Sequence, residues 1–281
     1  MPKLKPDKLR FGTAGIPHST EPRNTINGIK RVRELGLDAM ELEFVRSVNI
    51  TPQKAPMVKK VAEDNDIRLS CHGQYYINLA SKEPEKQLAS IARVVNAAVR
   101  AHQCGAWTMT FHAGFYMSRP KEIVAPIIHD AFKDALKVLE ENKIDIWVRP
   151  EVSGKISQWG DVDELIGVSK KFDSVLPCID FSHLYARTFG KANGYDYFRS
   201  VLAKLEQELG RHVLDNMHMH AQGIEFNNGG EKQHLMLKDS DFDYRGLLKA
   251  LKEFKVKGSL ISESPIPQDD ALLLQKTFNE L

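Results

Sequence analysis

Six short apolar runs of this sequence each end in a residue that can titrate or bind a metal ion. The terminal residues are His72, His112, Glu151, Asp180, His218 and Glu263. Three imidazoles and three carboxylates supply the nitrogen and oxygen donors that zinc and manganese take in proteins. Without a cation, so many ionisable groups at one place would have displaced pKa values and would lower stability. If folding brings these residues together, the set predicts a divalent metal centre.

Further donors lie close to these positions in the sequence. Asp180 and His183 are three residues apart, so one carboxylate and one imidazole could serve neighbouring ions. His220 lies just beyond another strand end, and Glu231 and His234 lie in a segment without a regular hydrophobic pattern. Long segments of this kind are often functional loops. We therefore add His183, Glu231 and His234 to the candidate ligands, while a position facing solvent remains an alternative for His220 and for His234.

The elements that must position these residues alternate along the whole chain. Apolar runs are followed by longer segments with helical spacing, which indicates βα units and a parallel sheet. The predicted strands are Leu9–Thr13, Ala39–Phe44, Ile67–His72, Thr108–His112, Ile144–Glu151, Val175–Asp180, Leu214–His218 and Ser259–Glu263. The predicted helices are Ile26–Leu35, Glu85–His102, Ile123–Glu140, Val162–Lys171, Tyr195–Glu208 and Tyr244–Lys252. Gly36, Gly105 and Gly258 stand where we expect helices to end.

Eight strand–helix units leave two main architectures, a closed barrel or an open doubly wound sheet. The sequence has no GxGxxG or GxxxxGK[ST] segment after a strand, so the phosphate-binding signatures of open sheets are missing. In a β/α barrel the carboxyl ends of all strands meet at one rim, where active sites are built. We therefore predict a single α/β domain over residues 1–281, a (β/α)8 TIM barrel with the metal centre at this rim.

Composition limits the classes of partner. Lys and Arg number 39 and Asp and Glu number 37, so the net charge of +2 gives no support for non-specific nucleic-acid binding, although a local basic groove stays possible. Cys71, Cys104 and Cys178 form no CxxC pair, which is typical of a reducing cytoplasm. There is no apolar leader and no run of about 18 apolar residues. We expect a cytoplasmic protein without a membrane partner.

Together these residues resemble the endonuclease IV family, which comprises zinc-dependent abasic-site nucleases built on a xylose isomerase-like barrel. The similar stretches follow the family's order over nearly the whole chain. They are His72-Gly-Gln-Tyr75-Tyr76-Ile-Asn78-Leu-Ala, Phe111-His112-Ala-Gly114, Glu151-Val-Ser-Gly, Cys178-Ile-Asp180-Phe-Ser-His183, Met217-His218 and Ser262-Glu263-Ser-Pro265. Each stretch is short, and the set as a whole carries the resemblance.

The resemblance implies a centre of three zinc ions, with manganese as an alternative metal. Glu151 would bridge two ions, one of them also held by His72 and His112. The remaining implied ligands are Asp180, His218 and Glu263 for the other bridged ion, and His183, Glu231 and His234 for the third. This chain departs from the family at two motifs: Asp-x-His is replaced by Glu231-Lys-Gln-His234, and His-x-Asn-Asp by His218-Met-His220-Ala. The third ion's site and nearby substrate contacts are therefore expected to differ.

The reaction that the resemblance implies is hydrolysis of the phosphodiester 5′ to an abasic site in double-stranded DNA, leaving a 3′-hydroxyl. A hydroxide generated by metal binding would attack phosphorus, and Glu151 would orient it. Tyr75 and Tyr76 stand where the family inserts side chains at the lesion, and Arg46 is a further candidate for this role. Packing against the rim is the alternative for the tyrosines, and a solvated loop position for Arg46. We expect the protein to act as a monomer.

Two other readings stay open. A sugar isomerase or epimerase on the same barrel binds one ion through a Glu, Asp, His, Glu set on the last four barrel strands, and this sequence provides that set. His72, His112 and His234 distinguish the two enzymes, because a single-metal site gives them no ligand role. A non-catalytic member that retains metal and binds DNA or a sugar is the second alternative.

Overall fold

Eight parallel strands form the centre of the computed structural model, which describes residues 5–281. The strands are β1 (Leu9–Ala14), β2 (Ala39–Glu43), β3 (Arg68–His72), β4 (Thr108–Phe111), β6 (Trp147–Pro150), β8 (Cys178–Asp180), β9 (Met217–His220) and β12 (Gly258–Ser262). Their order in the sheet is β6-β4-β3-β2-β1-β12-β9-β8. Parallel bridges from Val148 to Val175 and from Glu151 to Cys178 join the two edges of the sheet. The predicted β/α barrel is therefore confirmed.

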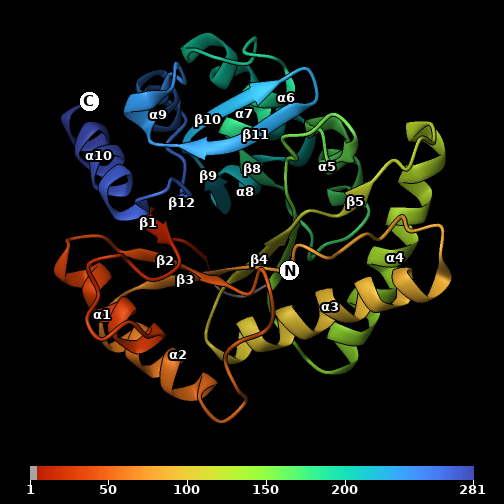
Figure 1. The fold of residues 1–281 in the computed structure, drawn as a ribbon, viewed down its shortest axis with the longest axis horizontal. Helices are drawn as coiled ribbons and strands as arrows, with labels where there is room; N and C mark the ends of the chain where they lie inside the picture. The colour runs from red at the N-terminus through yellow and green to blue at the C-terminus, as the bar shows by residue number, and fades with distance from the viewer. Residues whose placement is uncertain (1–4) are drawn as a thin grey trace.

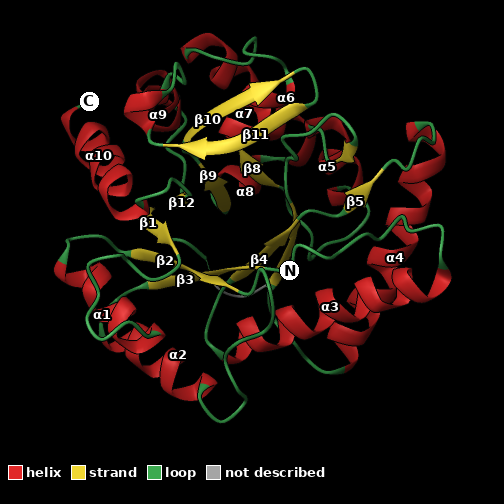
Figure 2. Cartoon of the chain, viewed as in Figure 1, coloured by secondary structure: helices red, strands yellow, loops and turns green. Residues whose placement is uncertain are grey.

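Helices surround this ring of strands (Figures 1 and 2). They are α1 (Thr25–Glu34), α2 (Ala55–Asp64), α3 (Pro84–Gln103), α4 (Lys121–Glu141), α5 (Val162–Ser169), α6 (Phe181–Arg187), α7 (Tyr195–Leu209), α8 (Arg211–Leu214), α9 (Tyr244–Glu253) and α10 (Pro267–Glu280), with a 3₁₀ helix η1 (Leu237–Asp239). The six predicted helices are present within a few residues of their expected ends. Four others, α2, α6, α8 and α10, were not expected from the pattern.

Glycines end two of the helices as predicted. Gly36 and Gly105 follow α1 and α3 with φ angles of 82° and 80°, a region that favours residues without a Cβ atom. The prediction for Gly258 is wrong, because Lys255 takes the left-handed position after α9, with a φ of 50°. Gly258 instead begins β12, where a Cβ atom would lie 1.8 Å from the carbonyl oxygen of Met217. A residue without a Cβ atom is therefore needed at position 258, because β12 and β9 approach each other closely there.

The interior of the barrel is polar, whereas the outer face of the sheet packs against the helices. In β2, Met40 and Leu42 belong to the apolar core, and Glu41 and Glu43 alternate with them on the inner face. In β9 two methionines and two histidines alternate in the same way. Strands buried on both faces are ordinarily apolar throughout. The inward acids and histidines therefore need partners inside the barrel.

Two small antiparallel pairs lie outside the barrel sheet. The first consists of β5 (Gly114–Phe115) and β7 (Gln158–Trp159). The second is a hairpin of β10 (Gly223–Asn227) and β11 (Gly230–Leu235), which packs on α6 (Figure 1). The prediction of an irregular loop around Glu231 and His234 is therefore wrong. Asn228-Gly229, the turn dipeptide typical of hairpins, is the signal that identifies the turn.

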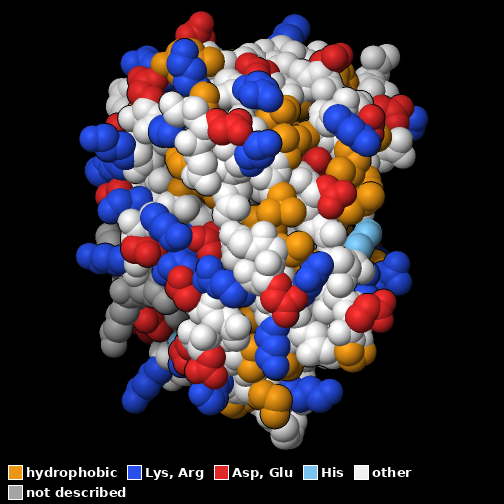
Figure 3. All heavy atoms as spheres, turned by 90° about the vertical axis from the view of Figure 1, so that its left-hand side faces the viewer, with side chains coloured by type: hydrophobic (Ala, Val, Ile, Leu, Met, Phe, Trp, Pro, Cys, Tyr) orange, Lys and Arg blue, Asp and Glu red, His pale blue; other side chains and the backbone are white. Residues whose placement is uncertain are grey.

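On one face of the molecule, basic and acidic side chains are interspersed around small apolar areas (Figure 3). This mixture agrees with the nearly balanced composition of 39 basic and 37 acidic residues. Across residues 5–281, no helix has both the length and the apolar character needed to cross a membrane.

Arg149 lies inside the barrel near the amino ends of the strands, where it contacts several of them. Its fully buried guanidinium donates hydrogen bonds to the Thr108 hydroxyl at 2.6 Å and to the carbonyl oxygens of Pro177 at 3.0 Å and Asn216 at 2.6 Å. The guanidinium also lies 5.0 Å from the centre of the Trp107 ring. Because these partners come from different barrel strands or the residues just before them, one side chain connects the strands at this level.

Replacing Arg149 with alanine is expected to lower the free energy of unfolding by about 3 kcal/mol, because several buried acceptors lose their donor. Denaturant unfolding followed by circular dichroism measures this loss. The matched variant Arg245→Ala removes an exposed arginine and should change stability by less than about 0.5 kcal/mol. A loss at Arg149 no larger than that of the control would contradict the structural role.

Candidate metal centre

A cavity of about 310 Å³ opens at the carboxyl ends of the barrel strands. Its lining includes His72, Tyr75, His112, Lys155, His183, Glu231, His234 and Glu263. Most of the predicted ligands therefore lie around one space, although they are separated by up to 191 positions in the sequence (His72 to Glu263). The convergence follows from the parallel sheet, in which the carboxyl ends of all strands lie at one end of the barrel. We call this end, with the cavity that opens there, the mouth.

Glu151 lies at the centre of this group, directly after β6, and is fully buried. One carboxylate oxygen is 3.2 Å from Nε2 of His72, and the other is 3.9 Å from Nε2 of His112. A ligand atom from each of these three residues lies within 4.8 Å of the others. One divalent ion could be held by this group, with two imidazole nitrogens and one carboxylate oxygen as donors.

Glu151 also belongs to a second group, with Asp180, His220 and Glu263. Nδ1 of His220 lies 3.3 Å from a Glu151 oxygen and 3.4 Å from a Glu263 oxygen. Three carboxylates and one imidazole around one point form the donor set of a hard or borderline divalent cation. Glu151 is thus placed so that it could bridge two ions, as the resemblance implies.

The expected place of His218 in this second group has to be corrected. His220, not His218, is level with Asp180, because the register of β9 against β8 pairs Asp180 with His220 and Cys178 with His218. The predicted strand stopped at His218, whereas β9 continues to His220. Since strand side chains repeat every two residues, His218 faces the same way but one layer deeper. His220 is fully buried, so the solvent-facing alternative for it is also wrong.

A third group lies beside the first two, where α6 and the hairpin meet. Asp180 caps α6 by accepting the backbone N–H of His183 at 2.6 Å, which fixes His183 at the mouth. Nε2 of His183 lies 3.3 Å from Nε2 of His234 and 3.5 Å from a Glu231 oxygen. Donor atoms of His183, His234 and Glu263 lie within 4.8 Å of one another. Both Glu231 and Glu263 can supply the carboxylate for an ion here.

Charge is distributed unevenly among these buried groups. Burial lowers the pKa of His112 to about 4, and burial raises the pKa of Glu263. Burial opposes ionisation of Glu151 too, but the charges of His112 and His220 hold the pKa of Glu151 well below its ordinary value. Displaced pKa values among buried groups in a cleft are typical of functional sites. A bound cation would stabilise the carboxylates that burial destabilises.

Three candidate DNA contacts lie in the loops after β2 and β3, and one of them, Tyr75, lines the cavity. Tyr75 and Tyr76 are 59% and 66% exposed, and the Tyr75 ring also contacts the His72 ring edge-on, with the ring centres 5.9 Å apart. Arg46 is also exposed. The backbone N–H of Tyr75 donates to the carbonyl oxygen of Val45 at 2.9 Å, which ties the loop after β2 to the loop after β3. The three side chains are therefore carried by adjoining loops at the edge of the cavity.

Two residues of β2 were missed by sequence reasoning. Glu41 is fully buried and contacts His218 and His220, while burial raises the pKa of Glu43 to about 8. The available signal was the alternation of acids with Met40 and Leu42, which marks a strand whose inner face is acidic. The predicted strand ran from Ala39 to Phe44 and ended in an apolar residue, so neither acid stood at its end.

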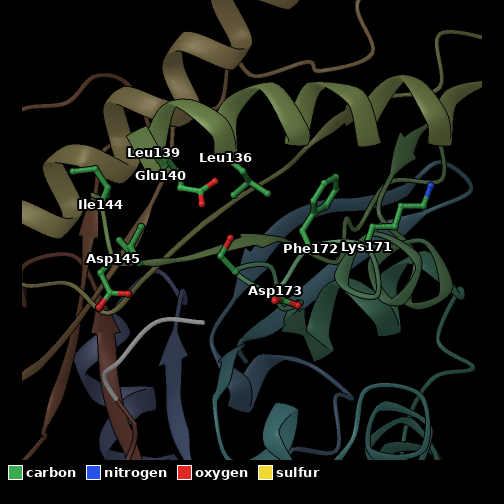
Figure 4. A pocket seen from close by; sticks show the side chains of 10 residues that line it. Leu136, Leu139, Glu140, Ile144, Asp145, Lys171, Phe172 and Asp173 are labelled. Atoms are coloured by element: carbon green, nitrogen blue, oxygen red, sulfur yellow. The ribbon is translucent and has the colours of Figure 1, made fainter. Parts of the chain in front are cut away.

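A larger cavity, about 560 Å³, lies at the opposite end of the barrel (Figure 4). It is bounded by the end of α4 and the segments before β6 and β8, with Leu136 and Phe172 among its walls. Glu140, Lys171 and Asp173 also line it. None of the predicted site residues contributes to this cavity, so it is separate from the metal centre.

The profile of the family described as xylose isomerase-like TIM barrel matches residues 29–279. An uncharacterized protein of Methanocaldococcus jannaschii is 42% identical over 273 residues, which cover 97% of this chain and 98% of that protein. A protein of Halorhodospira halophila named probable endonuclease 4 is 26% identical over 204 residues, 68% of this chain and 67% of that protein. The resemblance to endonuclease IV seen in the sequence is confirmed by these similarities.

Solved structures agree on the fold but come from two enzyme classes. Endonuclease IV from Thermus thermophilus superposes with a TM-score of 0.73 at 16% identity, covering 97% of this chain and 100% of that chain. A D-tagatose 3-epimerase-like protein also has a TM-score of 0.73 at 16% identity, with 96% of each chain covered. At such identities the superpositions establish the barrel alone. The side chains at the mouth must distinguish the functions.

Removing divalent metal with a chelator is expected to lower the Tm by about 5–10 °C, because ions that bind only the folded state stabilise it by about 3 kcal/mol at 100 times Kd. Before removal, elemental analysis should find about three zinc or manganese ions per chain. Replacing both His72 and His112 with alanine should remove about one ion and reduce the Tm shift. His212→Ala, an exposed residue of α8 at the other end of the barrel, should change neither. A Tm independent of the chelator would contradict the metal centre.

Proposed function

The chain belongs to the family of xylose isomerase-like TIM barrels, and on that premise we propose that it is a metal-dependent phosphodiesterase that cleaves double-stranded DNA 5′ to abasic sites. The observation that carries this proposal is the presence of three contiguous donor groups at the mouth, joined through Glu151 and Glu263. Two relatives named probable endonuclease 4, at 26% and 25% identity, support the same activity.

Five imidazoles lie at the mouth, four more than the single-metal set uses. A single ion would be complete with Glu151, Asp180, His220 and Glu263. The additional histidines lie on both sides of that set, as the His72–His112 pair and the His183–His234 pair. Clusters of ions that share carboxylates are typical of enzymes that displace an oxygen from phosphorus, because both the attacking and the leaving oxygen need stabilisation.

The residues of the mouth have distinct roles in this reaction. Bound divalent ions would supply charge stabilisation for the phosphate oxygens and lower the pKa of water. Glu151 would accept a hydrogen bond from the attacking water and orient it in line with the scissile bond. The water oxygen would bond to phosphorus as the bond from phosphorus to the 3′-oxygen breaks. The proton of the attacking water would pass to solvent, and the 3′-oxygen would take a proton from solvent and leave as a 3′-hydroxyl. Lys155, which lines the cavity, would contact a phosphate of the bound strand.

Recognition of the lesion would come from the exposed loops at the mouth. A missing base leaves a gap in the stack, and a flat side chain that enters it offsets the cost of unstacking. Tyr75, Tyr76 and Arg46 have the exposure and the chemistry for this role. Their loops are tied together by a backbone hydrogen bond, so they would enter the duplex as one unit.

A sugar epimerase is the second candidate, because Glu151, Asp180, His220 and Glu263 would hold one ion without any further residue. Such an enzyme would bind about one ion per chain and leave an abasic-site duplex intact. It would invert the configuration at one carbon atom of a ketose. Assays of ketose substrates alongside the DNA assay separate the two activities.

Incubation of the full chain with a duplex that carries one abasic-site analogue is expected to nick the strand 5′ to the lesion in the presence of Zn²⁺. Glu151→Gln should lower the incision rate by about 10³-fold, because an amide cannot bind the ions or orient water as a carboxylate does. Glu140→Gln, on the exposed end of α4, is the matched control and should retain the wild-type rate. Denaturing gel electrophoresis of an end-labelled strand measures the product. An intact strand at high enzyme with Zn²⁺ present would reject the proposal.

Replacing Tyr76 with alanine is expected to weaken binding of the abasic-site duplex by about 10-fold or more, because a stacking side chain contributes about 1–3 kcal/mol per base. Binding to an undamaged duplex of the same sequence should change much less. Fluorescence anisotropy with both duplexes gives the ratio of affinities. An equal loss for both duplexes would assign Tyr76 to general DNA contact and not to the lesion.

A further inference from the structure

Arg187, the last residue of α6, connects three segments of the chain beside the mouth. Its Nη1 donates hydrogen bonds to the carbonyl oxygens of Ser153 at 3.2 Å and Lys155 at 2.6 Å. Its Nη2 donates to the hydroxyl oxygen of Tyr116 at 3.3 Å. A planar guanidinium holds several acceptors in a fixed geometry. Arg187 therefore fixes the backbone on both sides of Gly154.

The Tyr116 hydroxyl is itself held in place by the start of α5. It donates to the carboxylate of Glu164, with both carboxylate oxygens at 2.8 Å. One of these oxygens also accepts the backbone N–H groups of Gly160 at 2.9 Å and Asp161 at 3.0 Å, as part of the capping box of α5. The negative charge of Glu164 is thus one hydroxyl group away from the guanidinium of Arg187. This chain of hydrogen bonds keeps the Arg187 side chain in one orientation.

Residues 153–157 carry Lys155 to the mouth. The side chain of Lys155 lines the cavity there, and the residue is exposed. The same segment is attached to the hairpin, because the backbone N–H of Glu231 donates to the carbonyl oxygen of Gly154 at 3.0 Å. The two segments pack so closely that a Cβ atom on Gly154 would lie 2.6 Å from the Cβ atom of Glu231. Arg187 and the hairpin together hold the backbone from which the Lys155 side chain extends.

We propose that Arg187 is a positioning residue for substrate binding, which holds residues 153–157 so that the Lys155 ammonium contacts a phosphate at the mouth. The inference rests on the proposed function, because it requires a substrate with a phosphate backbone. A lysine ammonium is a point charge on a flexible four-carbon stem, so its position depends on the backbone that carries it. Fixing that backbone before the substrate arrives lowers the entropy cost of the contact.

Direct contact with a phosphate is the competing role for Arg187. Arginine often binds phosphate through two parallel N–H groups. Both terminal nitrogens of Arg187, however, already donate to acceptors within the protein, at Ser153, Lys155 and Tyr116. This arrangement favours a positioning role, and the salt dependence of DNA binding distinguishes the two roles.

The experiment measures binding of a duplex whose abasic-site analogue follows a non-hydrolysable linkage, by fluorescence anisotropy at several salt concentrations. Lys155→Ala should weaken binding by about 10-fold and lower the slope of log Kd against log salt by about 0.9, the value for one phosphate contact. Arg187→Ala should reproduce most of both changes. The double variant should bind no more weakly than Lys155→Ala, because both substitutions remove the same contact. Lys171→Ala, an exposed lysine at the opposite end of the barrel, should leave the slope unchanged.

Steady-state incision and conservative variants separate positioning from a general loss of structure. A contact made equally in the ground state and the transition state affects KM, so Arg187→Ala should raise KM by about 10-fold and change kcat by less than about 2-fold. Its metal content should match that of the wild type. Arg187→Lys retains the charge but not the planar group, and should resemble Arg187→Ala. Tyr116→Phe removes one acceptor of Arg187 and should produce a smaller change of the same kind, which keeps the inference testable if the Arg187 variants do not fold.

Several outcomes would overturn the inference while leaving the proposed function intact. Additive losses in the double variant, with a slope lowered by two contacts, would make Arg187 a direct phosphate ligand. A lower Tm with an unchanged slope would assign it to packing, and loss of an ion would assign it to the metal centre. Wild-type binding by Arg187→Lys would show that only its charge matters, and an unchanged slope in Lys155→Ala would remove the phosphate contact itself. A wild-type protein that neither binds nor cuts the duplex would instead reject the proposed function.

Discussion

Burial of ionisable groups at one end of a closed sheet is the constraint on which the rest of this structure depends. Glu151 is fully buried and lies within 4 Å of nitrogens from four histidines, His72, His112, His183 and His220. Carboxylates and imidazoles so close together are stable only if charge is balanced within the cluster. Because β-strand side chains alternate, the barrel can direct these groups inward while its other face keeps an apolar core against the helices.

Much of this arrangement could be predicted from the sequence, because it follows from local patterns. Apolar runs that end in His72, Glu151 or Glu263 mark strands, and parallel strands bring their ends to one rim. Local patterns could not show that His220, and not His218, belongs to the group around Asp180. Both residues face the same side of β9, and only the register against β8 shows which of them is level with Asp180. Pairing between strands depends on contacts that a single sequence does not display.

The hairpin and the interior acids show a second limit of sequence reasoning. Apolar residues are few in β10 and β11, where Ile224 and Phe226 pack on the core, so hydrophobic alternation is short and the turn dipeptide is the main signal. Glu41 lies mid-strand, where an acid has no typical role, and its significance appears only from its contacts with His218 and His220. The TM-score of 0.73 to both an endonuclease and an epimerase-like protein points the same way. In this fold, function is decided by side chains that the backbone does not distinguish.

The hydrogen bonds of Arg149 have a consequence for the flexibility of the barrel. By reaching Thr108, Pro177 and Asn216 at once, its side chain joins segments of different strands, so these strands can separate only if all three hydrogen bonds break. Any flexibility that a ligand requires is therefore expected in the loops at the carboxyl ends of the strands.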